Sequence, residues 1–272
     1  MKIRIILAVI IALFAASCGE YEKLLKSSDY QLKKDKAIEY YEARKFVKAT
    51  ELFAQILPRY RASDEAEQLN WLNARAYYEL RDYIMAGTYF TTFSGTYPFS
   101  RYAEEALFMA AYCDYKMSPK PELDQDNTRK AIEGMLLFKR RYPASNRIAE
   151  ADMIIREMEE NLVEKSYLSA RLYYDMKQYR AAVVALNNSL NEYPDTKYRE
   201  EMMYLKLNSQ FLYAQFSFRE KQMERYLEAY DDYLTYTEEY PEGTFQKEVK
   251  KIYDALSRVI KITDIGTEND KN

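Results

Sequence analysis

Chemically reactive side chains are few in this chain of 272 residues. It contains two cysteines, Cys18 and Cys113, and no histidine. Histidine is the usual general base, activates serine and cysteine nucleophiles, and is the commonest metal ligand. Carboxylates are abundant, but on segments this rich in glutamate they are typical of solvated helix surface, and no GxxxxGK[ST] phosphate loop is present. We therefore expect no enzyme activity, no metal and no cofactor other than a covalent lipid.

That lipid is expected on Cys18, which closes a segment with the layout of a secretory signal. Lys2 and Arg4 precede an apolar run over residues 5–16 that is too short to span a bilayer. The run ends in AASC, a small-small-Cys sequence that resembles a bacterial lipobox. We predict that residues 1–17 are a signal peptide, and that Cys18 carries acyl chains that hold the protein durably on a membrane. An ordinary signal peptide with an incidental cysteine is the alternative.

Cys113 would be the only thiol left once Cys18 is lipidated, so no disulfide within the chain is expected. It lies in the apolar run LFMAAYCDY, where a buried cysteine behaves as a small hydrophobic residue. Gly19 follows Cys18 at the position where an aspartate is the familiar inner-membrane retention signal of enteric bacteria. The absence of aspartate there favours the outer membrane.

A short phrase recurs along the chain and predicts a repeat architecture. It reads TYPFSRYAEEA around Tyr97, and related copies contain Tyr60, Tyr142, Tyr193 and Tyr240, at intervals of 37 to 51 residues. Recurrence on that scale is typical of repeat arrays. The phrase joins the end of one helix to the start of the next, because proline stops a helix and the following serine or threonine can cap another.

Each copy is preceded by small and aromatic residues at fixed spacing. Small residues let two antiparallel helices approach closely, and the aromatic residues fill the space between helix pairs. In the first copy an arginine replaces the hinge proline, so that boundary departs from the pattern. The matching sets are Ala37, Tyr40, Ala49, Phe53 and Arg61; Ala74, Tyr77, Ala86, Phe90 and Pro98; and Ala170, Tyr173, Ala182, Leu186 and Pro194.

This framework resembles the tetratricopeptide repeat. It predicts an all-α, right-handed solenoid over residues 31–262, with about five helix pairs and a C-terminal capping helix. Residues 18–30 are expected to form a lipidated N-terminus and tether, and residues 263–272 a disordered tail. The predicted units are about 31–60, 65–98, 101–143, 146–194 and 197–241, with the cap at 244–262.

Together, the lipobox and the five repeats resemble the BamD (YfiO) family of outer-membrane assembly lipoproteins. The most specific segments are YPASN…AEA and YYDMKQYRAAVVALNNSLNEYPDTKYREEM, from Tyr173 to Met202. The resemblance implies a lipid-anchored scaffold on the periplasmic face of the outer membrane. Its implied partners are a BamA-type β-barrel subunit and unfolded outer-membrane protein precursors.

Two other functions fit the same pattern. One is a glycan-capture outer-membrane lipoprotein, and the other is an unrelated periplasmic adaptor built from tetratricopeptide repeats. The formal net charge of −3 gives no case for nucleic acid as a partner.

The first helix of each pair should line the concave side of such a stack. Residues spaced by four and then three share one helical stripe, and rings beside cations suit an extended peptide. The family resemblance implies which peptide this would be, because barrel precursors commonly end in an aromatic residue and a free carboxylate. Packing of these rings between repeats is the alternative interpretation. The predicted stripes are Lys34-Ile38-Tyr41, Trp71-Arg75-Tyr78, Phe108-Tyr112-Tyr115 and Tyr167-Arg171-Tyr174. Among them, the predicted peptide-binding residues are Lys34, Tyr41, Trp71, Arg75, Tyr78, Tyr112 and Tyr115.

Overall fold

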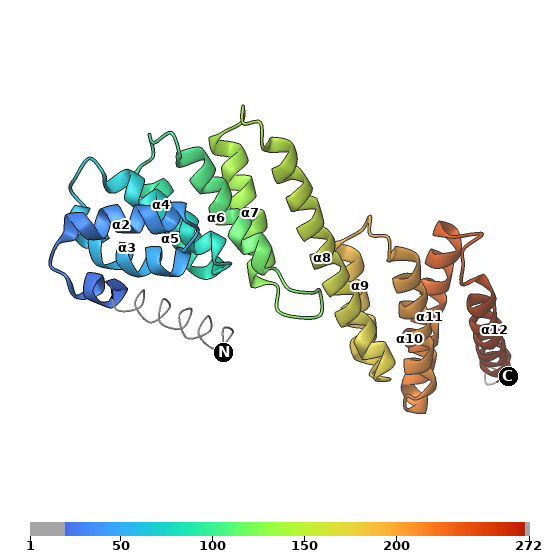
Figure 1. Cartoon of the computed structure of the whole chain (residues 1–272). Helices are drawn as coiled ribbons and strands as arrows, with labels where there is room; N and C mark the ends of the chain where they lie inside the picture. The colour runs from blue at the N-terminus through green and yellow to red at the C-terminus, as the bar shows by residue number, and fades with distance from the viewer. Residues whose placement is uncertain (1–19, 270–272) are drawn as a thin grey trace, which may run out of the picture. The chain divides into compact units, whose positions relative to one another are not determined.

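The chain folds into helices joined by short turns. The computed structural model describes residues 20–269, and this part of the chain contains no strand. The helices form two compact units (Figure 1). Unit 1 comprises residues up to 119 together with 125–158, and unit 2 comprises residues 120–124 together with those from 159 onward. The helix α8, Ile148–Asp175, begins in unit 1 and ends in unit 2.

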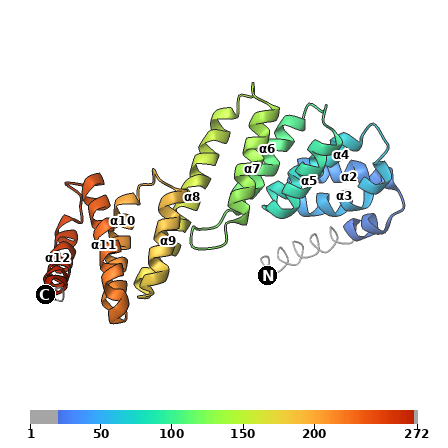
Figure 2. The same ribbon diagram turned by 180° about the vertical axis from the view of Figure 1, so that it is seen from behind.

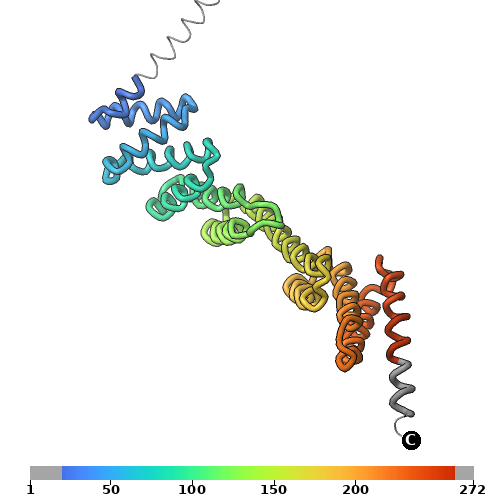
Figure 3. The backbone as a smooth tube through the Cα atoms, turned by 90° about the horizontal axis from the view of Figure 1, so that it is seen from below, coloured from blue at the N-terminus to red at the C-terminus, as the bar shows by residue number. Residues whose placement is uncertain are grey.

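In unit 1, the helices between residues 30 and 141 each pack against the next one along the chain, so they form a stack of antiparallel pairs (Figures 1 and 3). Its core contains the aromatic residues Phe53, Phe90, Phe93, Phe108 and Phe138, all fully buried. After a helical segment at residues 20–26, its helices before α8 are α2 (Tyr30–Glu42), α3 (Phe46–Tyr60), α4 (Ala66–Glu79), α5 (Tyr83–Thr96), α6 (Ala103–Met117) and α7 (Asp126–Arg141).

In unit 2, α10 packs against α9 and α11, and the last helix, α12, packs against both α10 and α11 (Figure 2). The buried core of this unit includes Leu186, Leu207, Tyr236 and Val249. Beyond α8, its helices are α9 (Tyr179–Glu192), α10 (Arg199–Gln215), α11 (Arg219–Glu239) and α12 (Gln246–Asn269). The all-helical repeat fold predicted from the sequence is confirmed.

Both ends of the helical array differ from the predicted arrangement. The helix α12 continues to Asn269, so residues 263–269, expected in a disordered tail, are helical. Residues 20–26, expected in a tether, are also helical, and Tyr21 and Leu24 are buried against the first helix pair. Both apolar side chains lie on one face of this helix, and burial of that face favours packing of the segment against the first helix pair.

Small residues set the close approach of paired helices. Ala74, Ala86, Ala170 and Ala182 are all buried, as the spacing predicts. The closest approach is at Gly134 on α7, where an added Cβ atom would lie only 2.6 Å from the Cβ atom of Ala111 on α6.

The turns within three of the helix pairs share one backbone design. Arg44, Arg81 and Lys177 have φ angles of 57°, 60° and 59°, in the left-handed region. The amide of Arg44 donates to the carbonyl of Tyr41, and the next amide donates to the carbonyl of Tyr40; the other two turns repeat these bonds. This is the Schellman arrangement that ends helices. It fixes the tyrosine pair at the end of each first helix.

The hinge serine or threonine caps the turn that leads into the next helix. Ser100 accepts a hydrogen bond from the amide of Tyr102, the residue immediately before α6, at 3.0 Å. Ser145 and Thr196 accept equivalent bonds, from the amides of Arg147 and Tyr198. The hydroxyl therefore orders the turn, and the residue at the turn's end is held against the preceding repeat.

Candidate protein-interaction site

The first residue of each predicted stripe packs against the residue that precedes the next repeat. The rings of Trp71 and Tyr102 lie 4.7 Å apart and 8° from parallel. Tyr167 and Tyr198 repeat this stack at 4.1 Å and 1°. At the same place in the third repeat, the Arg147 guanidinium lies 3.4 Å from the centre of the Phe108 ring. These residues therefore join successive repeats.

Lys34 and Trp71 consequently lie in the packing between repeats. The Lys34 ammonium donates a hydrogen bond to Glu65, which occupies the position equivalent to Tyr102, and this bond raises the pKa of Lys34. The side chain of Lys34 is buried. Trp71 is only 7% exposed and also contacts Phe90 and Phe93. Neither residue forms an open wall of a groove.

Arg75 is exposed enough to meet a ligand but already has two carboxylate partners. Its guanidinium lies 2.9 Å from Glu105 and 3.8 Å from Glu79. Arg171 repeats this arrangement in unit 2, with Glu201 at 3.1 Å and Asp175 at 3.7 Å. A carboxylate ligand would have to displace one of these partners.

The predicted tyrosines of unit 1 are half-buried and keep an exposed edge. The Tyr112 ring lies 6.4 Å from Tyr78 and 5.4 Å from Tyr115, so these three form a continuous tyrosine row. Burial raises the pKa of Tyr78 and of Tyr115, and the Tyr115 hydroxyl donates to Glu157 at 3.0 Å. Tyr41 lies apart from the row, against Phe46. The tyrosine row offers flat apolar edges and neutral hydroxyls.

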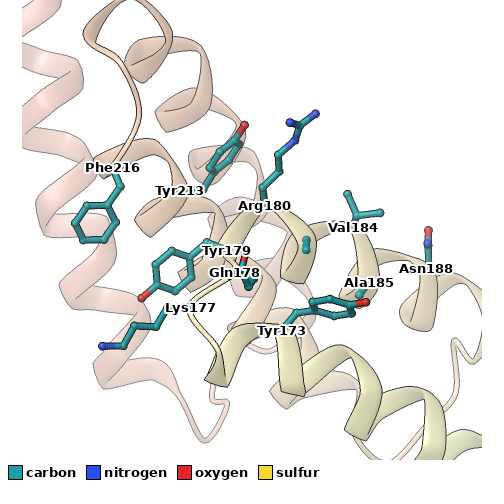
Figure 4. Close-up of a pocket in the computed structure, with 11 residues that line it drawn as sticks. Tyr173, Lys177, Gln178, Tyr179, Arg180, Val184, Ala185, Asn188, Tyr213 and Phe216 are labelled. Atoms are coloured by element: carbon teal, nitrogen blue, oxygen red, sulfur yellow. The ribbon is translucent and has the colours of Figure 1, made fainter.

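A groove of about 740 Å³ in unit 2 was not predicted from the sequence (Figure 4). It opens among the end of α8, the start of α9 and the end of α10. The exposed fraction is 57% for Val184 and 74% for Phe216, whose ring is nearly parallel to that of Tyr179. The residues that define this α9 groove are Tyr173, Lys177, Tyr179, Arg180, Val184 and Phe216.

The α9 groove combines apolar surface with free cations. Lys177 and Arg180 are exposed and make no ion pair within the described part of the chain. Arginine and lysine beside open aromatic rings suit a partner surface that carries carboxylates and apolar side chains. The features that the sequence analysis sought in the first two repeats are therefore combined in unit 2.

Two sequence signals could have indicated this groove. Val184, the second valine of AAVVAL, does not occupy a framework position of the repeat, and its side chain is exposed on α9. The turn QFSF places Phe216 and Phe218 between two helices, and both are largely exposed. Large apolar residues that belong to no core position are typical of interaction sites.

Residues 20–269 contain no cluster of three or more metal-ligating side chains. Within the same range, no helix has the length and apolar character needed to cross a membrane. Cys113 is buried, and burial raises the pKa of its thiol to about 12. The predicted signal peptide and Cys18 lie outside the described residues.

The helix pairs and their hinge motif define a tetratricopeptide-type repeat protein. The chain belongs to the YfiO family, described as outer membrane lipoprotein, because the model of that family matches residues 30–212. No curated protein matches the chain.

Similar solved structures also consist of such repeats. One is the TPR2AB domain:pHSP90 complex of yeast Sti1, with 13% identity, a TM-score of 0.37, and coverage of 85% of this chain and 99% of that one. Another is the structure of kinesin light chain nearly identical TPR-like repeats from Podosopora anserina, with 13% identity, a TM-score of 0.32, and coverage of 86% and 95%.

Proposed function

We propose that this lipoprotein is a non-catalytic scaffold of the outer-membrane β-barrel assembly machinery. It faces the periplasm, and it binds the barrel-forming subunit and extended segments of unfolded barrel precursors. Membership of the YfiO outer membrane lipoprotein family is the observation that carries this proposal. Two separate surfaces, the α9 groove and the tyrosine row, give a scaffold the means to hold two partners.

The α9 groove is the proposed docking site for a periplasmic domain of the barrel subunit. Val184, Phe216 and the neighbouring Phe218 expose apolar surface that a folded partner would cover. Lys177 and Arg180 at the rim would pair with carboxylates of the partner. Such charge pairs orient the partner and speed its association. Aromatic and arginine anchors of this kind commonly dominate binding energy.

The tyrosine row is the proposed site for extended precursor segments. Tyr78, Tyr112 and Tyr115 are partly exposed and lie ring beside ring, which fits successive side chains of an extended peptide. Arg75 lies on the same helix as Tyr78, and a terminal carboxylate can exchange with Glu105 for its guanidinium. Lys34 has no such role, because it is buried beside Glu65.

Co-purification from detergent-solubilised outer membrane tests the groove. Val184→Arg should abolish co-elution of a β-barrel protein, because it places a charge in the apolar contact. Leu234→Arg is the matched control, since Leu234 is similarly exposed but lies on α11, outside the α9 groove. Co-elution of a surface transporter with the unaltered chain would instead support glycan capture, and loss of the barrel in both variants would reject the groove.

Peptide titration tests the tyrosine row. Tyr112→Ala should weaken binding of a Phe-ending peptide about tenfold, equivalent to about 1.4 kcal/mol, while co-elution of the barrel persists. The carbon of the Arg75 guanidinium lies 5.9 Å from the centre of the Trp71 ring. Trp71 emission should therefore change when a peptide carboxylate replaces Glu105 as the partner of Arg75. Phe99→Ala, which removes a fully exposed ring outside both surfaces, is the control. Equal affinity of all three chains would move the peptide site elsewhere.

A further inference from the structure

The N-terminal helix brings the predicted lipid anchor very close to the folded repeats. Tyr21 is buried against the first helix pair, and its hydroxyl donates hydrogen bonds to the carbonyl of Lys48 and to the carboxylate of Glu51. Leu24 is buried beside it. The Lys33 ammonium donates to the carbonyl of Leu25 at 3.0 Å, which fixes the end of the same helix. Among the described residues, the chain is therefore packed on the first repeat from Tyr21 onward.

Cys18 precedes Tyr21 by only three residues. Even a fully extended chain spans at most about 3.3–3.6 Å per residue, so three residues reach about 10–11 Å. A lipid-modified Cys18 must stay at the membrane surface, because its acyl chains lie in the bilayer. Because this link is short in any conformation, the first repeat must stay close to the leaflet.

The surface around Tyr21 suits the headgroup layer of a phospholipid leaflet. The Lys48 ammonium lies 4.7 Å from the centre of the Tyr21 ring and 5.6 Å from that of Tyr40, and Lys45 lies 5.8 Å from the latter. Neither lysine makes an ion pair within residues 20–260. Both are therefore available to lipid phosphates. Tyrosine rings beside lysines are typical of the membrane–water interface.

The same helix also carries exposed charges of both signs. Lys23 and Lys26 add two cations, and Glu20 and Glu22 add two carboxylates. These four charges balance, and Lys45 and Lys48 outnumber the one carboxylate beside Tyr21, that of Glu51, so the surface keeps a small excess of positive charge. The attraction is modest, about 1 kcal/mol for each lysine near an anionic surface. The short covalent link, rather than charge, is the main constraint.

We propose that the first helix pair lies directly on the phospholipid leaflet to which Cys18 is anchored, with Tyr40, Lys45 and Lys48 at the headgroups. The membrane-facing surface is thus the outer face of the first repeat. The proposal rests on lipidation of Cys18, which is part of the proposed function, but not on the identity of any protein partner.

Fluorescence quenching in vesicles tests this arrangement. A fluorophore is placed at Ala43→Cys, an exposed position one helical turn beyond Tyr40. Cys113 is buried and resists labelling, because its thiol pKa is raised to about 12. The lipidated full chain is reconstituted into phosphatidylethanolamine vesicles that contain some phosphatidylglycerol and a lipid with a spin-labelled headgroup. We expect strong quenching of the unaltered chain.

Two changes should release the repeat from the surface. A flexible Gly/Ser insertion of about ten residues between Gly19 and Glu20 adds a root-mean-square reach of about 16–19 Å, and should lower quenching severalfold. Tyr21→Ala should have the same effect, because it detaches the helix from the repeat. Lys23→Ala, at an exposed neighbouring position, should leave quenching within about twofold of the unaltered chain.

The outcomes separate this inference from the proposed function. Weak quenching of the unaltered chain, with lipid on Cys18 verified by mass, overturns the proposed contact. Undiminished quenching after the insertion overturns the role of the short link. In either case co-elution with a β-barrel protein would still stand, whereas absence of lipid on Cys18 would contradict the lipoprotein assignment itself.

Discussion

Trp71 and Tyr102 stack in parallel across the boundary between two repeats, 31 positions apart in sequence. Tyr167 and Tyr198 have the same separation and the same geometry. Tyr204 and Phe245 form another such stack at 4.6 Å and 3°. One ring comes from the first helix of a repeat, and the other comes from the hinge turn, which a hydroxyl orders at Ser100 and Thr196. The recurring hinge phrase therefore also supplies the joint between repeats.

Removal of one ring from this joint should weaken the stack. Tyr102→Ala is expected to lower the free energy of unfolding by at least the about 0.5–1.5 kcal/mol that an aromatic pair contributes beyond its buried area. Phe99→Ala is the matched control, since Phe99 is fully exposed in the same hinge and should change stability by less than about 0.5 kcal/mol. Urea unfolding followed by Trp71 emission measures both. Similar losses in the two variants would mean that the stack does not stabilise the joint.

Two glycines should respond in opposite ways to alanine. Gly134→Ala is expected to destabilise the chain by about 1–3 kcal/mol, because the new methyl group would overlap Ala111, which has no flexible side chain to move aside. Gly95→Ala meets nothing within 4 Å and should stabilise α5 by up to about 1 kcal/mol. Thermal unfolding of the two variants checks the sign. A stabilised Gly134→Ala would show that α6 and α7 are further apart than the structure has them.

Stability should fall at alkaline pH. Burial raises the pKa of Tyr167, Tyr204 and Tyr236 above the usual 10.0, and the bond to Glu200 raises that of Tyr236 further. The folded state therefore keeps these protons after the unfolded state has lost them. Their contribution is complete below about pH 10 and is lost as the pH rises further. Urea midpoints measured from about pH 8 to 11 should decrease only above pH 10.

Tyr236→Phe isolates one part of this dependence. At neutral pH this substitution should lower the free energy of unfolding by about 0.5–1.5 kcal/mol, because the hydrogen bond to Glu200 is lost. Above pH 10 the urea midpoints of the variant should decline less steeply than those of the unaltered chain. The exposed Tyr173→Phe should retain the full slope. A variant at Tyr236 with the slope of the unaltered chain would contradict the assigned role of its hydroxyl.

Lipid attachment should depend on Cys18 alone. Cys18→Ala removes the sulfur that accepts the lipid, so the signal peptide should remain uncleaved by the lipoprotein peptidase. Metabolic labelling with a palmitate analogue reads out the modification, and Cys113→Ala is the control that should still incorporate label. Label that persists on the Cys18→Ala chain would reject the lipobox assignment.

The sequence by itself determined the repeat architecture, because the signals for it are local. Proline and small residues act through the backbone and through close approach, so Ala74, Ala86 and Pro98 fix where helices pair and where they end. The positions of these residues needed no knowledge of distant contacts. The family resemblance followed from the same motifs and is confirmed over residues 30–212.

Only the tertiary structure decided which side chains remain open. A helical stripe contains residues that face the next repeat as well as residues that face solvent, and spacing does not separate them. Trp71 and Lys34 are covered by residues 31 positions away, Arg75 is paired with Glu105, and the α9 groove combines side chains of three helices. The fate of Tyr21 likewise depends on Lys48 and Glu51, which lie well beyond its helix. Exposure and pairing are properties of contacts between distant segments, so they follow from the folded chain.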